Sequence, residues 1–345
     1  MKFDTTILYP NLNDMATIAE AADELGFAGL WTAETNSDPF LPLTIAAEHS
    51  QRMNLGTAIA VTFPRSPTVL ATMAWDLARF SNGRFILGLG AQIKAHNERR
   101  FGAKWEKPIR KMRETIEAIR AVWDCWQNGT PLNYEGEFFK LNLMTPFFHS
   151  GPLPHPPPPI YISAVNEQML RLAGSHCDGV HIHAFHTARY LREFALPEVE
   201  AGLKQNSGTR EGFGVSTAVF AIPTDGPKSV AEYEQFARQQ ISFYMSTPAY
   251  RIVTELHGWE ETAGTLGKMA VRGQWDEMPR QITDEMLDTF AVTGTWAELP
   301  NKIKKRYGDT LTRISYYLPF IPGEYDQGWQ DSLTCFRTIG GKDEP

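Results

Sequence analysis

The sequence alternates between apolar segments of strand length and amphipathic helical segments, and this alternation runs through most of its 345 residues. Eight apolar segments have the composition of strands buried on both faces, with at least one helical segment between each successive pair. The predicted strands are 3–9, 29–33, 55–61, 85–89, 160–164, 179–183, 214–222 and 313–317. This rhythm predicts an α/β fold, a (β/α)8 barrel whose parallel strands are surrounded by helices.

Local signals mark the ends of several predicted helices. Asp14 is expected to cap the first helix and Gly26 to end it. Thr295 and Glu298 have the spacing of a capping box. The predicted helices are 15–25, 41–51, 67–80, 109–127, 167–176, 188–205, 230–245 and 295–307.

A doubly wound open sheet is the competing fold. It favours a glycine-rich phosphate-binding turn after its first strand, whereas residues 10–13 here are Pro-Asn-Leu-Asn. A barrel accounts for about 250 residues. We therefore expect one domain over 1–345, with the surplus in insertions near 92–108, 129–159 and 250–290.

Charge and cysteine content exclude several function classes. Lys plus Arg number 33 and Asp plus Glu number 40, which gives a net charge of −7 and disfavours a binder of nucleic acid or anionic membranes. Cys125, Cys177 and Cys335 are too sparse for a disulfide framework or a zinc site. With no leader pattern and no apolar span, the sequence predicts a cytoplasmic protein that acts on a small molecule.

Function in such a barrel lies at the carboxyl ends of the strands. Glu34 and Asp38 follow the second strand, where carboxylates can exchange protons, although a solvated loop is the alternative. Arg65 follows the third strand and suits an anionic substrate group, although a surface ion pair is equally consistent.

Two further strand ends favour backbone contacts with a ligand. Small residues at Gly90, Ala91 and Gln92 would let the backbone approach a ligand closely. Ala164, Val165 and Asn166 lead directly into a helix, whose N-terminal N–H groups can bind phosphate, unless Asn166 is an ordinary cap.

The sixth strand contributes His181 and His183, which lie on one side of the strand, and His186 follows. Proton transfer or hydrogen bonding to a ligand is one interpretation, and packing is the other. A metal site would require a convergent Asp, Glu or Cys ligand, and no metal ligands are predicted.

These strand-end segments resemble the bacterial luciferase-like family, in its branch of flavin- and coenzyme F420-dependent oxidoreductases. The stretch LARFSNGRFILGLG at 77–90 is similar to the family's most recognisable segment, and Asp178-Gly179 matches near the sixth strand. The similar segments also include 55–59, 65–71, 110–115, 160–164 and 173–180. The stretch GAQIKAHNERRFG at 90–102 resembles a deazaflavin-dependent subgroup and favours F420 over FMN.

The resemblance implies a flavin-type ring in the barrel mouth and a non-proline cis peptide bond between Ala58 and Ile59. Ring contacts would come from Glu34, Ala58, Ile59, Gly90, Ala91 and Gln92. Phosphate would lie on Ala164, Val165 and Asn166. The family also implies a homodimer through the second and third helices.

One departure affects the expected chemistry. Several deazaflavin dehydrogenases of the family carry Asp-His after the second strand, with a catalytic histidine, whereas this chain has Glu34-Thr35. Catalysis is therefore assigned to candidates among Glu34, Asp38, His181 and His183.

The sequence favours hydride transfer between F420 and a small organic substrate. Three alternatives stay open: an FMN-dependent monooxygenase, a metal-dependent hydrolase using His181, His183 and His186, and a barrel that only sequesters a cofactor.

Overall fold

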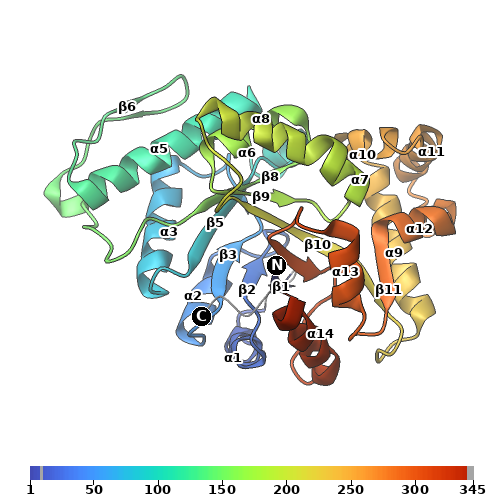
Figure 1. Ribbon diagram of the computed structural model, residues 1–345. Coiled ribbons are helices and arrows are strands. Elements are labelled where there is room, and N and C mark those ends of the chain that lie inside the picture. The colour runs from blue at the N-terminus through green and yellow to red at the C-terminus, as the bar shows by residue number, and fades with distance from the viewer. Residues whose placement is uncertain (8–10, 340–345) are drawn as a thin grey trace.

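Eight parallel strands close a barrel in the computed structural model, which describes residues 1–7 and 11–339 (Figure 1). β1 (Lys2–Ile7) pairs with β2 (Gly29–Thr32) on one side and with β12 (Arg313–Tyr316) on the other. The barrel continues through β3 (Asn54–Thr57), β5 (Phe85–Gly90), β8 (Ile160–Ala164), β9 (Gly179–Ile182) and β10 (Gly214–Pro223), which pairs with β12. The predicted (β/α)8 barrel is confirmed. Residues 8–9, predicted to end the first strand, lie outside the described residues.

Helices surround the barrel because each has one apolar face. On α5 (Pro108–Asn128), Met112, Ile116, Ile119 and Trp123 are buried at helical spacing. The other surrounding helices are α1 (Met15–Leu25), α2 (Leu41–Glu48), α3 (Pro67–Phe80), α6 (Glu167–His176), α7 (Ala188–Tyr190), α8 (Leu196–Gln205), α9 (Val230–Met245), α13 (Leu299–Tyr307) and α14 (Asp326–Ile339).

Three local expectations need correction, and two elements were not predicted. Asp14 does not cap α1, because its backbone is helical and its carboxylate accepts a hydrogen bond from Asn11 Nδ2 at 2.8 Å. The third predicted strand is divided into β3 and β4 (Ala60–Val61). The helix predicted over 188–205 contains a π-helical segment, Leu191–Ala195. β11 (Ala291–Gly294) pairs with residues 220–223 at the end of β10. This strand and α14 are elements that the sequence analysis missed.

The three insertions carry short elements. Residues 92–108 contain α4 (Lys94–Arg99), and 129–159 contain a hairpin of β6 (Tyr134–Glu135) and β7 (Lys140–Leu141), followed by η1 (Pro146–Phe148). The third insertion contains η3 (Pro248–Tyr250), α10 (Arg251–Glu255), α11 (Glu260–Val271), η4 (Met278–Gln281) and α12 (Asp284–Phe290). Figure 1 shows α10, α11 and α12 grouped beside α9. Assignment of 1–345 to one domain stays a prediction.

No helix within the described residues is both long enough and apolar enough to cross a membrane.

A buried ion pair joins the first and last strands inside the barrel. Arg313 donates to both carboxylate oxygens of Asp4, from Nε at 2.8 Å and from Nη2 at 2.7 Å. It also donates to Asn54 Oδ1 at 2.9 Å, and Trp31 Nε1 donates to Asp4 Oδ2 at 2.9 Å. One guanidinium–carboxylate pair therefore links β12, β1, β2 and β3.

Large side chains fill the barrel above this pair. Trp31 and Tyr161 lie inside it, and glycines opposite them provide the necessary space. A methyl group at Gly56 would lie 2.3 Å from the Trp31 ring, and one at Gly214 would lie 1.8 Å from the Tyr161 hydroxyl oxygen. The lower half of the barrel is consequently a packed core.

Asp4→Asn should lower the free energy of unfolding by about 3–5 kcal/mol, because it leaves the buried Arg313 charge without its counterion. Urea unfolding followed by circular dichroism measures the change. Asp309→Asn is the matched control, because Asp309 also pairs with a cation, Lys304, but its side chain is 98% exposed. Equal midpoints for the two variants would contradict the role given to the Asp4–Arg313 pair.

Candidate active site

The barrel interior changes character at the carboxyl ends of the strands. Thr6, Ser163 and Ala218 each lie two residues after a residue whose side chain faces the barrel interior. Because side chains alternate along a strand, these three also face inward. Each is small and partly exposed, whereas Trp31 and Tyr161 below them are buried. Solvent can reach these inward-facing positions only from the end of the barrel. We call this end, formed by the carboxyl ends of the strands, the mouth.

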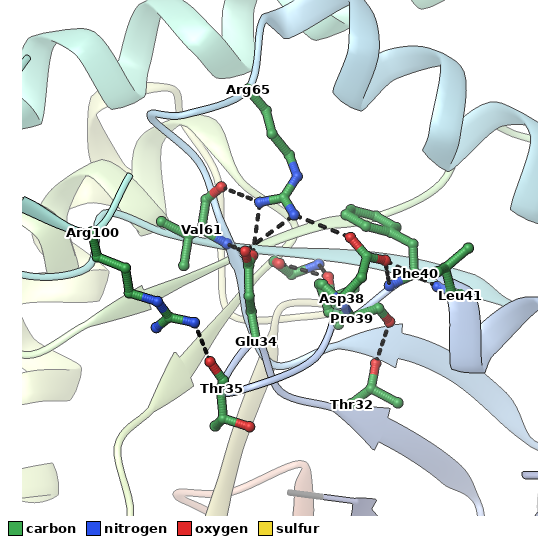
Figure 2. Close-up of polar contacts among 12 residues, drawn as sticks. Thr32, Glu34, Thr35, Asp38, Pro39, Phe40, Leu41, Val61, Arg65 and Arg100 are labelled. Atoms are coloured by element: carbon green, nitrogen blue, oxygen red, sulfur yellow. Dashed lines mark hydrogen bonds and ion pairs between the residues drawn. The ribbon is translucent and has the colours of Figure 1, made fainter. Parts of the chain in front are cut away.

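Three charged side chains form a closed network at one side of the mouth (Figure 2). Arg65 binds both carboxylate oxygens of Glu34, from Nη1 at 2.7 Å and from Nη2 at 3.1 Å. The same guanidinium donates to Asp38 Oδ2 at 3.2 Å and to the Val61 carbonyl at 2.8 Å. The Val61 N–H donates to Glu34 Oε2 at 2.7 Å. The network therefore fixes the loop after β2 against the segment after β4.

This geometry favours a positioning role for Glu34, Asp38 and Arg65. Asp38 Oδ1 additionally accepts the N–H groups of Phe40, at 2.8 Å, and Leu41, at 3.1 Å, where α2 begins. Arg65 is already engaged by two carboxylates, so its guanidinium is not free to bind a substrate anion. The predicted catalytic roles of Glu34 and Asp38 and the anion-binding role of Arg65 stay predictions.

The peptide bond between Ala58 and Ile59 is cis, as the resemblance implies. The Ala58 N–H donates to the Thr32 carbonyl at 2.7 Å, and the Glu34 N–H donates to the Ile59 carbonyl at 3.2 Å. The segment between β3 and β4 is thus hydrogen-bonded to the end of β2. Both Ala58 and Ile59 are partly exposed at the mouth.

Gly90 ends β5 where the chain approaches this segment closely. A methyl group at Gly90 would lie 2.5 Å from Ile59 Cδ1 and 2.7 Å from Ser163 Oγ. Ala91 and Gln92 follow, both partly exposed, and Gln92 has a left-handed backbone with φ of 58°. The structure therefore brings together the residues predicted to contact a ring, and that contact stays a prediction.

Asn166 precedes α6 next to the mouth. Its carbonyl accepts the N–H groups of Met169 and Leu170, at 3.1 and 3.0 Å. Within the described chain its side chain does not cap the helix, and its amide is 3.5 Å from the Ala249 carbonyl. The earlier N–H groups of the first turn have no partner within the helix and can face an anion. Phosphate binding by Ala164, Val165 and Asn166 stays a prediction.

His181 lies inside the barrel, below the mouth. Its ring packs edge-on against Trp31, with ring centroids 5.0 Å apart, and at a tilt against Tyr161, with centroids 5.3 Å apart. Its Nε2 has no hydrogen-bond partner among the described residues. Burial, helped by the nearby charge of Arg313, lowers the pKa of His181 to about 3, so the ring is neutral.

His183 lies at the mouth, two residues after His181 on the same side of the chain. The Phe185 N–H donates to its Nδ1 at 3.0 Å. Its ring packs against Tyr244 of α9 at 4.4 Å and against Tyr250 of η3 at 4.6 Å. The pKa of His183 is lowered to about 3, mainly by burial and to a smaller extent by the neighbouring His186.

His186 faces away from the mouth and is buried. Its Nδ1 lies 2.9 Å from the His183 carbonyl and 3.3 Å from Thr217 Oγ1. Burial lowers its pKa to about 4. Across residues 1–7 and 11–339, no group of three His, Cys, Asp or Glu side chains could hold a metal ion. The metal-dependent hydrolase therefore has no ligand set among the described residues.

Comparison with known proteins gives the same assignment as the resemblance. Residues 2–313 match the family described as luciferase-like monooxygenase. The chain is 32% identical over 279 residues to 5,10-methylenetetrahydromethanopterin reductase from Archaeoglobus fulgidus, covering 78% of both chains.

The chain belongs to the luciferase-like monooxygenase family.

This luciferase-like oxidoreductase is also similar to one further sequence and to one solved structure. An uncharacterized protein of Mycobacterium tuberculosis is 43% identical over 328 residues, which cover 94% of this chain and 96% of that protein. The solved structure of coenzyme F420 dependent tetrahydromethanopterin reductase from Methanopyrus kandleri superposes with a TM-score of 0.79 at 20% identity, covering 98% and 99% of the two chains. That second likeness shows the shared fold.

Sequence analysis missed several residues that shape the site of this oxidoreductase. Tyr244 and Tyr250 pack on His183 after β9, across the barrel from Glu34, and the Tyr244 and Tyr317 hydroxyl oxygens lie 2.8 Å apart. Asn97 is fully buried and donates to the Ala91 carbonyl at 2.8 Å, which holds the segment after β5. Arg100 donates to the Thr35 carbonyl and joins this segment to the loop after β2 (Figure 2). Tyr250, Asn97 and Arg100 come from insertions, which follow no barrel periodicity that could have indicated them. Tyr244 lies on the predicted helix 230–245 and Tyr317 ends the predicted strand 313–317, but their spacing does not show that they meet.

The buried histidines should make the protein less stable in acid. Unfolded histidine has a pKa of about 6.5, whereas His181 and His186 have lowered pKa values of about 3 and 4. Between these limits the unfolded chain binds more protons, so unfolding becomes easier as the pH falls from about 6.5 toward 4. Each histidine contributes about 1.4 kcal/mol per pH unit.

Urea unfolding at several pH values measures this slope. His181→Gln should reduce it by one proton, and His96→Gln, at an exposed position, should keep the wild-type slope. A stability that is constant between pH 6.5 and 4.5 would contradict the neutral state of these rings.

Proposed function

We propose that this luciferase-like protein is a coenzyme F420-dependent oxidoreductase that transfers a hydride between the deazaflavin and a small organic substrate. The observation that carries the proposal is the open mouth, where small inward-facing residues lie above a filled barrel and beside the start of α6. This end provides small side chains against which a ring can lie and N–H groups for a phosphate.

The residues present fit such a cofactor. Thr6, Ser163 and Ala218 would lie under the ring, because they are the partly exposed inward positions of three strands. Ala58, Ile59, Gly90, Ala91 and Gln92 would contact its edge, and Ala164, Val165 and Asn166 would hold its phosphate. The cofactor, when bound, would supply the hydride chemistry, and the protein would orient the reactants and exclude water.

Two observations support F420 over FMN. The segment 90–102 resembles a deazaflavin subgroup. A putative coenzyme F420-dependent oxidoreductase of Mycobacterium tuberculosis is 30% identical to this chain over 298 residues, which cover 79% of this chain. An FMN-dependent monooxygenase is the second candidate, because the family as described consists of monooxygenases.

Titration of the purified protein with F420 and, separately, with FMN discriminates between the two. We expect quenching of F420 fluorescence to saturate at lower concentration than that of FMN. Tight binding of FMN with none of F420 would favour the monooxygenase, and binding of neither would contradict the proposed function.

The phosphate position can be tested with two substitutions of Asn166. Asn166→Asp should weaken F420 binding by about tenfold or more, because a carboxylate near the phosphate adds charge repulsion of at least about 1 kcal/mol. Asn166→Ser is the matched control: serine and aspartate are both good N-caps, so helix stability is preserved in each variant. Equal affinities of the two variants would place the phosphate elsewhere.

We further propose a homodimer formed through α2 and α3. An apolar groove of about 350 Å³ lies between these helices, lined by residues that include Phe40, Met73 and Leu77. At its edge Leu41 is 57% exposed and Phe80 is 50% exposed. Exposed apolar side chains around a groove are typical of an interface between protein chains. The proposal also includes a cytoplasmic location. Cys125, Cys177 and Cys335 are free thiols, which is consistent with a reducing compartment.

Phe80→Glu should convert the dimer to a monomer in sedimentation velocity experiments, because it would bury two symmetry-related charges in the interface. Phe147→Glu is the control, since Phe147 is 89% exposed on η1, outside the groove. A dimer that persists in Phe80→Glu would contradict this interface, and a monomeric wild type would contradict the homodimer.

A further inference from the structure

The imidazole of His183 has a defined hydrogen-bonding state. Because the Phe185 N–H donates to Nδ1, that nitrogen must carry a lone pair. In the neutral ring the proton is then on Nε2, which becomes a hydrogen-bond donor. Phe185 thus selects the tautomer through its backbone, independently of any charged side chain.

The packing around His183 holds this ring in place. Tyr244 contacts it at an interplanar angle of 76° and Tyr250 at 37°, so two elements, α9 and η3, restrict its rotation. The titratable groups that face the ring are Tyr244, Tyr250 and His186. Burial raises the pKa of Tyr250, so this hydroxyl stays protonated near neutral pH. None of the three stabilises an imidazolium as a carboxylate would.

One cation and two carboxylates form the charged wall of the mouth, which therefore carries a net charge of −1. Arg65 is satisfied by Glu34 and Asp38, and the opposite wall consists of tyrosines and the neutral His183. An anionic group on a substrate would have to be desolvated beside this negative charge, and the described residues of these two walls offer it no unpaired cation.

We infer that the Nε2–H of His183 donates a hydrogen bond to the oxygen of an uncharged carbonyl substrate at the barrel mouth. This inference rests on the proposed function and deepens it by naming a substrate class and a catalytic residue. A neutral imidazole can polarise a carbonyl without first being protonated.

The step balances as a two-electron reduction. The carbonyl carbon accepts a hydride from the reduced deazaflavin, and the carbon–oxygen π bond breaks. The oxygen, whose negative charge grows, is stabilised by the His183 N–H and takes one proton from water at the mouth, which yields an alcohol. The deazaflavin is oxidised by two electrons, and the proton that it releases to solvent replaces the one taken from water. Oxidation of an alcohol is the reverse of this step.

Imidazole nitrogen NMR spectra of the protein without cofactor test the tautomer directly. We expect the Nε2–H pattern for His183 and no titration of this ring between pH 5 and 8, with its signals assigned by their loss in His183→Gln. An Nδ1–H pattern, or a titration midpoint near 6.5, would overturn the inference. This arm does not depend on F420.

Variants test the catalytic role in steady-state kinetics with reduced F420. His183→Leu should lower kcat by about 100-fold, as removal of an oxyanion donor does, with the F420 dissociation constant unchanged. His183→Gln keeps an N–H donor on the same edge and should retain more activity than His183→Leu. His49→Gln, on the surface beside Glu20, is the control and should match the wild type. Equal kcat values for His183→Leu and the control would overturn the inference.

A matched pair of ketones tests the substrate class. 2-Heptanone and 6-oxoheptanoate have the same chain length and differ in one terminal carboxylate. We expect kcat/KM to be higher for the neutral ketone by about tenfold or more. Preference for 6-oxoheptanoate, or no reduction of either ketone by protein that binds F420, would overturn the inference while leaving the proposed function intact. Failure to bind F420 would instead contradict the proposed function.

Discussion

The buried pair of Asp4 and Arg313 is the interaction on which the rest of the barrel depends. It joins the first strand to the last, and its further bonds to Trp31 and Asn54 include the second and third strands. A barrel has no free edges only if this seam is closed. With these polar groups and the rings above them filling the lower interior, the space left for a ligand lies at the carboxyl ends of the strands.

The mouth combines two walls of different chemistry. On one side Arg65 binds both Glu34 and Asp38, and this network fixes the loops after β2 and β4. On the other side tyrosines surround a neutral histidine, whose proton position is determined by a backbone N–H. The first wall provides rigidity and the second provides a hydrogen-bond donor. This division suits hydride transfer, in which the protein orients the reactants while the cofactor supplies the electrons.

The barrel could be predicted from the sequence because its signal is periodic. Apolar strands such as 160–164 and amphipathic helices such as α5 depend on local residue spacing, which the sequence shows directly. β11 was missed because it follows α12 without a break and pairs only with the outer part of β10. The end of β2 was recognised as a site, yet the engagement of Glu34 by Arg65 depends on residues 31 positions apart. Tyr250 enters the mouth from an insertion, so no strand rhythm indicated it. Tyr244 lies on a predicted helix, but its contact with His183 joins residues that are far apart in the sequence.

A crystal structure of the protein with bound F420 is the most direct test of the central claim, that the barrel mouth holds a deazaflavin. The account predicts the ring over Thr6, Ser163 and Ala218, its phosphate at the start of α6, and His183 Nε2 facing the space next to the ring. A ring bound elsewhere on the molecule, or a phosphate held by Arg65 after rupture of its pairs with Glu34 and Asp38, would contradict the account.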